Sequence, residues 1–137
     1  MALQNFSTEQ TVIVVNGREI TDWGETDPAY SDAPIDASAV LRRGQGGRGI
    51  RLDRINPGRT VTLNLNPGSP DSAFMQGLLI SKANITMGKT IIGTLEVAAG
   101  DEGVIVNDGN VGRAGQTITD DVYIMEFNSW IAAKGGE

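Results

Sequence analysis

The first residues whose spacing suggests chemistry are three glycines in the stretch RRGQGGRGIR, residues 42–51. Gly44, Gly46 and Gly49 match the G-x-G-x-x-G pattern of a dinucleotide-binding loop. Asp71 lies about where the ribose-binding carboxylate of such a site is expected. The pattern binds a cofactor only when its last glycine opens a helix, because the helix N-terminus holds the pyrophosphate.

No helix is expected after these glycines. Residues 50–55 alternate apolar and charged side chains with a period of two, which is typical of a half-buried strand, and Asn56-Pro57-Gly58 then forms a turn signal. No strand–helix–strand unit surrounds the site. The sequence therefore predicts no nucleotide cofactor, and the stretch is interpreted as a glycine-rich loop that carries arginines.

Other catalytic or metal-binding arrangements are also disfavoured. The chain has no His and no Cys, so the usual general base and the commonest metal ligands are missing. Asp120 and Asp121 are adjacent, and neighbouring residues of a strand point to opposite faces. The NDGN stretch at residues 107–110 does not have EF-hand spacing and is read as a turn. We expect no enzyme activity, no cofactor and no metal.

Length and composition indicate one domain over residues 1–137. The N-terminal residues 1–7 lack the features of a signal peptide, and no apolar run approaches the length of a membrane span. We therefore expect a protein without a membrane anchor that is made in a cytosol. The net charge of −6, from 17 acids and 11 bases, argues against a simple nucleic-acid binder.

The charges are distributed unevenly along the chain. Residues 9–36 hold seven acids and one base, whereas residues 42–59 hold six arginines and one acid. These segments could be neighbouring solvated faces or complementary halves of a self-association surface. The arginines could likewise contact phosphate or form an assembly arm. We favour assembly, because overall acidity opposes tight phosphate binding.

The expected secondary structure is mostly β. Thr11 to Val15 and residues 18–23 form a predicted hairpin around Asn16-Gly17. Residues 24–35 read as irregular, and residues 36–43 and 49–55 form a long hairpin with its tip at Gly44 to Gly47. Further strands are expected at the following ranges: 60–66, 85–87, 90–97, 104–106 and 121–131.

One helix is expected after residue 69. Ser69 is a candidate N-cap, Pro70 occupies the favoured first position, and Asp71 complements the helix dipole. A stripe of four apolar side chains, Phe74, Met75, Leu78 and Leu79, would pack against the sheet. The sequence thus predicts a mainly β fold, a two-sheet antiparallel β-barrel or sandwich, with one flanking helix and a long hairpin arm.

Several segments together resemble a known family. They are the VNG hairpin, the Gly- and Arg-rich hairpin, the GRTVTLNLNPGSPDSAFMQGLL strand-into-helix unit and the C-terminal FNSWIAAKGGE. In this order they resemble the small tail tube proteins of contractile-tailed bacteriophages, a group that also resembles the tube protein of type VI secretion systems. The resemblance covers nearly the whole chain, and its most specific part is residues 58–79.

The resemblance implies a structural virion protein that forms stacked, hexameric rings. The rings would make the hollow inner tail tube, through which DNA passes without specific binding. Sheath, tape-measure and baseplate proteins would be its partners, and it would reside in the virion tail after synthesis in the host cytoplasm. Alternatives are a ring-forming tail or baseplate adaptor, a type VI-like tube protein and a soluble ligand-binding module.

Three sets of residues are candidates for the assembly surfaces. The inter-ring arm set, which the resemblance assigns to clasping the next ring, is Arg42, Arg43, Gly44, Gly46, Gly47, Arg48, Gly49 and Arg51. The acidic partner-surface set is Glu19, Asp22, Glu25, Asp27, Asp32 and Asp36. The uncharged lumen-face set is Thr62, Asn64 and Asn66.

Overall fold

The computed structural model describes residues 11–135, so the signal-peptide prediction for residues 1–7 lies outside the described residues. Within that range the chain forms nine strands and one helix. In order they are β1 (Thr11–Val15), β2 (Arg18–Ile20), β3 (Tyr30–Pro34), β4 (Ala39–Arg43), β5 (Gly49–Asp53), β6 (Arg59–Leu65), α1 (Pro70–Ser81), β7 (Ile85–Ile91), β8 (Glu96–Asp108) and β9 (Asp121–Ala133).

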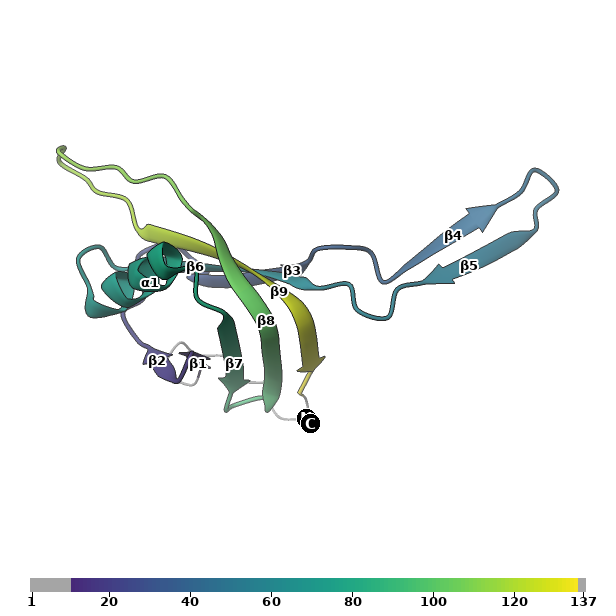
Figure 1. Ribbon diagram of the computed structural model, residues 1–137, viewed down its shortest axis with the longest axis horizontal. Coiled ribbons are helices and arrows are strands. Elements are labelled where there is room, and N and C mark those ends of the chain that lie inside the picture. The colour runs from purple at the N-terminus through teal and green to yellow at the C-terminus, as the bar shows by residue number, and fades with distance from the viewer. Residues whose placement is uncertain (1–10, 136–137) are drawn as a thin grey trace.

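The body is a curled antiparallel sheet, which in the described chain has seven strands in the order β2-β1-β7-β8-β9-β6-β3. The helix α1 covers one part of this sheet (Figure 1). Strands β4 and β5 pair only with each other and project from the body as a separate arm (Figure 1). The predicted mainly β fold with one helix and a hairpin arm is confirmed, in the form of a sandwich-like half-barrel plus a two-stranded sheet.

The core lies inside the curl of the sheet. Its residues come from all the central strands and from one helix position, and alternate positions of each strand point inward. Its members are Ile13, Val15, Ile20, Val61, Leu63, Leu65, Met75, Ile85, Met87, Ile105, Tyr123, Met125 and Phe127. The apolar positions 61, 63 and 65 of β6 therefore form its inward face.

Local sequence explains the first hairpin and the helix. Asn16 and Gly17 both have positive φ, 48° and 83°, as the two-residue turn between β1 and β2 requires. The Ser69 side chain accepts a hydrogen bond from the N–H of Ser72, and Pro70 opens α1 as predicted. The helix ends where Lys82 adopts the left-handed conformation.

Several predicted boundaries were wrong. The segment read as irregular contains β3, which tolerates Pro34 because it is the edge strand beside β6. The predicted strand at residues 90–97 is divided by a turn, so its halves belong to β7 and β8. The return strand of the first hairpin ends at Ile20, and beyond it Trp23 forms an isolated bridge to Leu65.

The last strand carries apolar residues on both faces for half of its length, which is typical of a central strand. Strand β9 lies between β8 and β6, so both of its edges are paired. Its inward residue Phe127 is fully buried and contacts Trp130 with a ring-centroid distance of 5.8 Å. None of the helices in the described range is long and apolar enough to cross a membrane.

Candidate assembly surface

The arm is the most exposed regular element of the described chain. Its register pairs Arg43 with Gly49, and the N–H of Gly44 donates to the carbonyl of Arg48 at 2.8 Å. Gly47, with φ of 84°, occupies the tight tip, where its N–H donates to the carbonyl of Gly44. The predicted hairpin and its tip are confirmed, although β4 begins at Ala39, three residues later than expected.

The register gives the arm two different faces, because directly paired residues of antiparallel strands lie on the same side. The pairs Val40–Leu52 and Arg42–Ile50 form one face, which we call the apolar arm face. Its three aliphatic side chains, Val40, Leu52 and Ile50, are 51–55% exposed. Arg43 lies on the opposite face, together with Leu41, Arg51 and Asp53.

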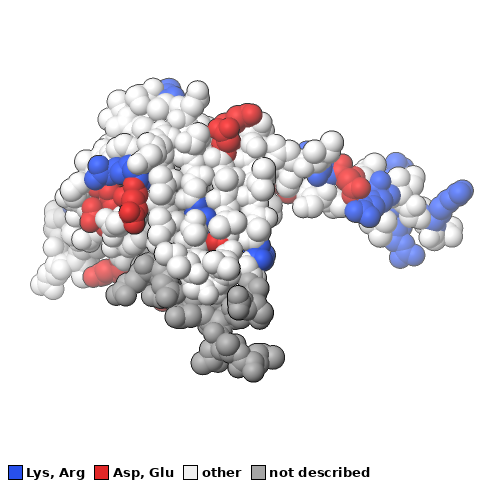
Figure 2. Space-filling view, turned by 90° about the horizontal axis from the view of Figure 1, so that it is seen from below, with Lys and Arg blue, Asp and Glu red and all other residues white. Residues whose placement is uncertain are grey.

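The arm is also strongly basic (Figure 2). Residues 39–54 hold five arginines and one aspartate, a net charge of +4, so the remainder of the −6 chain carries −10. Within the described residues, the side chains of Arg42, Arg43 and Arg48 make no ion pair or hydrogen bond. These arginines are therefore free to bind a negatively charged partner.

The structure spreads the predicted acidic residues from β2 to the base of the arm. Glu19, Glu25 and Asp27 are exposed, while Asp22 is half-buried. The last two, Asp32 and Asp36, are already paired within the chain.

Asp32 bonds to Arg59 and to the Tyr30 hydroxyl, and it lies 3.7 Å from Lys89. Burial opposes ionisation of Asp32, but the Tyr30 and Arg59 hydrogen bonds outweigh it and lower its pKa. Asp36 lies 3.7 Å from Arg54.

The predicted lumen residues follow one side of β6. Thr62 is half-buried and Asn66 is exposed just after the strand. Asn64 is only 8% exposed, because its side-chain amide donates to the carbonyl of Ala29 at 3.2 Å. In the described structure the 24–29 loop therefore covers Asn64, and the assignment of this face to a lumen stays a prediction.

Sequence reasoning missed a groove at the base of the arm, which we call the root groove. It has a volume of about 330 Å³, and six residues of its lining matter here: Ile35, Asp36, Pro57, Glu102, Val104 and Glu126. Ile35 and Val104 are 43% and 41% exposed, so the groove combines apolar surface with three carboxylates. The sequence signal was Glu126, the one charged residue between Val122 and Phe127 of β9.

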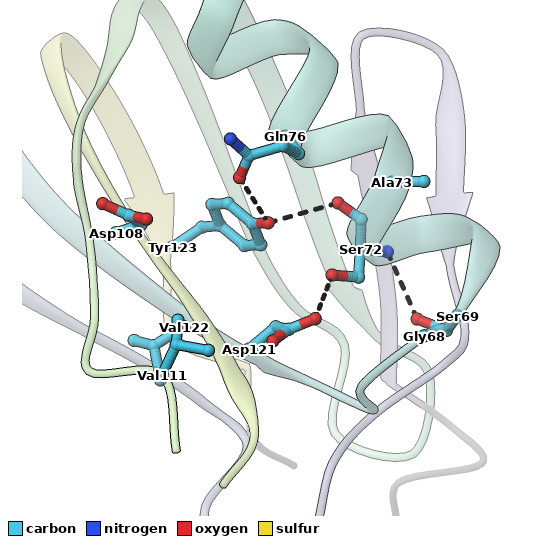
Figure 3. A pocket seen from close by; sticks show the side chains of 10 residues that line it. All are labelled: Gly68, Ser69, Ser72, Ala73, Gln76, Asp108, Val111, Asp121, Val122 and Tyr123. Atoms are coloured by element: carbon cyan, nitrogen blue, oxygen red, sulfur yellow. Dashed lines mark hydrogen bonds between the residues drawn. The ribbon is translucent and has the colours of Figure 1, made fainter. Parts of the chain in front are cut away.

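A second pocket of about 360 Å³ lies between α1 and the 109–120 loop (Figure 3). Most of its polar side chains already make hydrogen bonds within the chain. The Asp121 carboxylate accepts from the Ser72 hydroxyl and from Arg113, and the Tyr123 hydroxyl donates to Gln76 Oε1 at 3.0 Å. Burial raises the pKa of Tyr123. These bonds make the pocket a structural junction between the helix and β9.

The paired carboxylates considered in the sequence diverge as expected. The Asp120 carboxylate accepts from the backbone N–H groups of Glu25 and Thr26, whereas Asp121 faces α1. Among residues 11–135, no group of three or more His, Cys, Asp or Glu side chains is placed to hold a metal ion.

Comparison with solved structures identifies the fold. The chain resembles the tube-terminating cap of the anti-feeding prophage, at 13% identity and a TM-score of 0.56, covering 98% of this chain and 95% of that one. It also resembles the sheath/tube terminator of the extracellular contractile injection system PVC, at 14% identity and a TM-score of 0.57, over 97% of this chain and 99% of that one. A chain of the PVC sheath-tube complex matches at 14% identity and a TM-score of 0.55, over 95% of this chain and 92% of that one.

Neither a protein-family model nor a curated protein matches the sequence. At these identities the likeness establishes a shared fold that extends over nearly all of this chain and of each chain compared. The fold is thus one found in a tube-terminating cap, a sheath/tube terminator and a sheath-tube complex of contractile injection systems, which are related to contractile tails.

Proposed function

We propose that this protein is a non-enzymatic structural component of a contractile-tail-like particle, in which copies assemble into rings through the basic arm. The observation that carries the proposal is the arm itself. It projects from the body, exposes four aliphatic side chains and has a charge opposite to the rest of the chain (Figures 1 and 2). A two-stranded hairpin is marginally stable alone in water, so a partner surface is its natural complement.

In the first candidate function, rings of this protein stack into the hollow inner tube of a phage tail. Hexameric rings would surround a lumen through which DNA passes, and the excess negative charge of the body would repel phosphate. Sheath, tape-measure and baseplate proteins would bind the tube. The protein would be made in the host cytoplasm and end in the virion. The match to a chain of a sheath-tube complex supports this candidate.

The second candidate function is a single ring that closes or joins a tube. Two of the matched structures are described as a tube-terminating cap and a sheath/tube terminator, and both align with nearly the full chain. Such a terminal ring would use the same arm but would not stack without limit. A secretion-type tube protein is a variant of the first candidate, since its fold and mode of stacking would be the same.

Electron microscopy of the purified protein over a range of concentration and salt separates these candidates. Long hollow filaments of uniform width are the expected result for a tube protein. Single closed rings would identify the terminal-ring function. A protein that remains monomeric in every condition would contradict both, and a soluble binding module would then be the better description.

A further inference from the structure

We propose that the arm of one copy binds in the root groove of a second copy, with the apolar arm face against Ile35 and Val104 and with Arg42 beside Glu126 and Glu102. This inference rests on the proposed self-assembly and names the surface that receives the arm. Of the predicted acidic partner-surface residues only Asp36 lines this groove, and its other two carboxylates come from β8 and β9.

The donor surface is the apolar arm face. Val40, Ile50 and Leu52 are each about half exposed, and the arm contacts no second layer in the body that could cover them (Figure 1). Arg42 lies on this same face, because it pairs with Ile50. A partner must therefore offer apolar surface and negative charge within a few ångströms of each other.

The root groove offers both. Its aliphatic residues Ile35 and Val104 are exposed, and Glu102 and Glu126 line the same groove. Val104 and Glu126 are directly paired across β8 and β9, so their side chains lie on the same face of the sheet. Within the described range Glu126 makes no ion pair, whereas Glu102 accepts one hydrogen bond from Asn128.

The charge of the arm and its position both indicate that the arm in the root groove belongs to a second copy. The arm carries +4 and the remainder of the chain −10, so arm and body of different copies attract. The arm of the same copy starts beside the groove and leads away from it (Figure 1). Donor and acceptor are different patches, so the contact is heterologous and repeats into a closed ring or an open filament.

The sharpest test compares two arginines of one hairpin. Arg42→Glu changes the apolar arm face, and Arg43→Glu makes the same charge change on the opposite face. Sedimentation velocity of the full chain should show roughly a tenfold rise in the concentration needed for assembly with Arg42→Glu and a much smaller rise with Arg43→Glu. Unchanged melting temperatures would show that each variant remains folded.

The acceptor is tested by Glu126→Lys, with Glu19→Lys as the matched control on β2. Glu126→Lys should weaken assembly as much as Arg42→Glu does, and combining the two should restore most of the loss. Glu19→Lys should leave assembly near the wild-type level. Equal effects of the two lysine variants would overturn the inference, as would a combined variant that is no better than either single one.

Failure of this inference can be separated from failure of the proposed function. If removal of the arm abolishes assembly while Glu126→Lys assembles like wild type, the arm binds another surface and the proposed function survives. If the protein without its arm assembles normally, both proposals are wrong. A wild-type protein that stays monomeric at every concentration also overturns both.

Discussion

The Nζ atom of Lys89 lies 3.7 Å from the Oδ2 atom of Asp32. Lys89 belongs to β7 and Asp32 to β3, which are the third and the last strands of the curled sheet in the described chain. Lys89 is only 8% exposed and also binds Glu96 at 2.9 Å. Asp32 in turn binds Arg59. This buried group of charges joins the two sides of the half-barrel, where no backbone hydrogen bond connects β3 with β7.

Replacing Lys89 by Ala should therefore destabilise the fold. Asp32 and Glu96, whose side chains are only 11% and 16% exposed, would lose the cation that they share, at a cost of about 3 kcal/mol in the free energy of unfolding. The matched control is Lys134→Ala, which removes an 81% exposed amine 3.7 Å from the same Glu96 and should cost about 0.5 kcal/mol or less. Equal denaturation midpoints for the two variants would show that the buried group does not hold the sheet closed.

Asp71 provides a second test, at the junction of β2 and α1. Its buried carboxylate accepts from Arg18 Nε at 2.7 Å and from the N–H groups of Thr21 and Asp22. Asp71→Ala leaves these donors without their acceptor and should lower stability by about 2–3 kcal/mol. Asp71→Asn keeps one acceptor oxygen and should lose less. Urea denaturation would measure both, and no loss in the alanine variant would contradict the assigned role.

The lowered pKa of the Asp71 carboxyl group also predicts how the stability of the fold depends on pH. Burial opposes the ionisation of Asp71, but the hydrogen bonds from Thr21, Arg18 and Asp22 outweigh it, so its folded pKa is lower than its ordinary value of 3.8. A lowered pKa gives stability that is complete above 3.8 and is lost as pH falls through the folded pKa.

The measurement compares wild type with Asp71→Ala from pH 7 to pH 2. The difference in unfolding free energy should be constant at neutral pH and shrink below about pH 4. A difference that stays constant down to pH 2 would exclude the ionised carboxylate as its source.

Gly103 should not tolerate a side chain. A Cβ at this position would lie 2.4 Å from Phe127 Cδ1 and 3.1 Å from the carbonyl oxygen of Ile85. Because the Phe127 ring is fully buried, it cannot move away easily, and Gly103→Ala should cost about 1–3 kcal/mol. The control is Gly88→Ala on β7, where a Cβ meets no described atom within 4 Å. Thermal unfolding should give a clearly lower melting temperature for Gly103→Ala than for Gly88→Ala.

Local sequence signals predicted much of this fold. The Asn16-Gly17 turn, the Ser69 cap and the alternation along β6 each specify structure over a few residues, and the structure contains all three. Strand β3 was missed because its pattern is weak and its pairing with β6 is determined by contacts far along the chain. The turn between β7 and β8 was missed because residues 92–95 do not carry a strong turn signal.

The candidate site was predicted less completely. The arm followed from glycines and arginines close together in sequence, so its hairpin could be recognised directly. The root groove brings Ile35, Glu102 and Glu126 together from three separate segments, and only the sheet register shows that they are neighbours. Asp32 looked like a surface acid in the sequence, yet the curl of the sheet buries it beside Lys89.

Removing the arm tests the central claim most directly. The N–H of Arg54 bonds the carbonyl of Ser38 at 2.8 Å, so an Asn-Gly turn can replace residues 39–53 without disturbing the body. Electron microscopy and sedimentation should then be compared with wild type at equal concentration. We predict rings or tubes for wild type and a folded monomer with an unchanged melting temperature for the armless protein. Normal rings or tubes from the armless protein would contradict assembly through the arm.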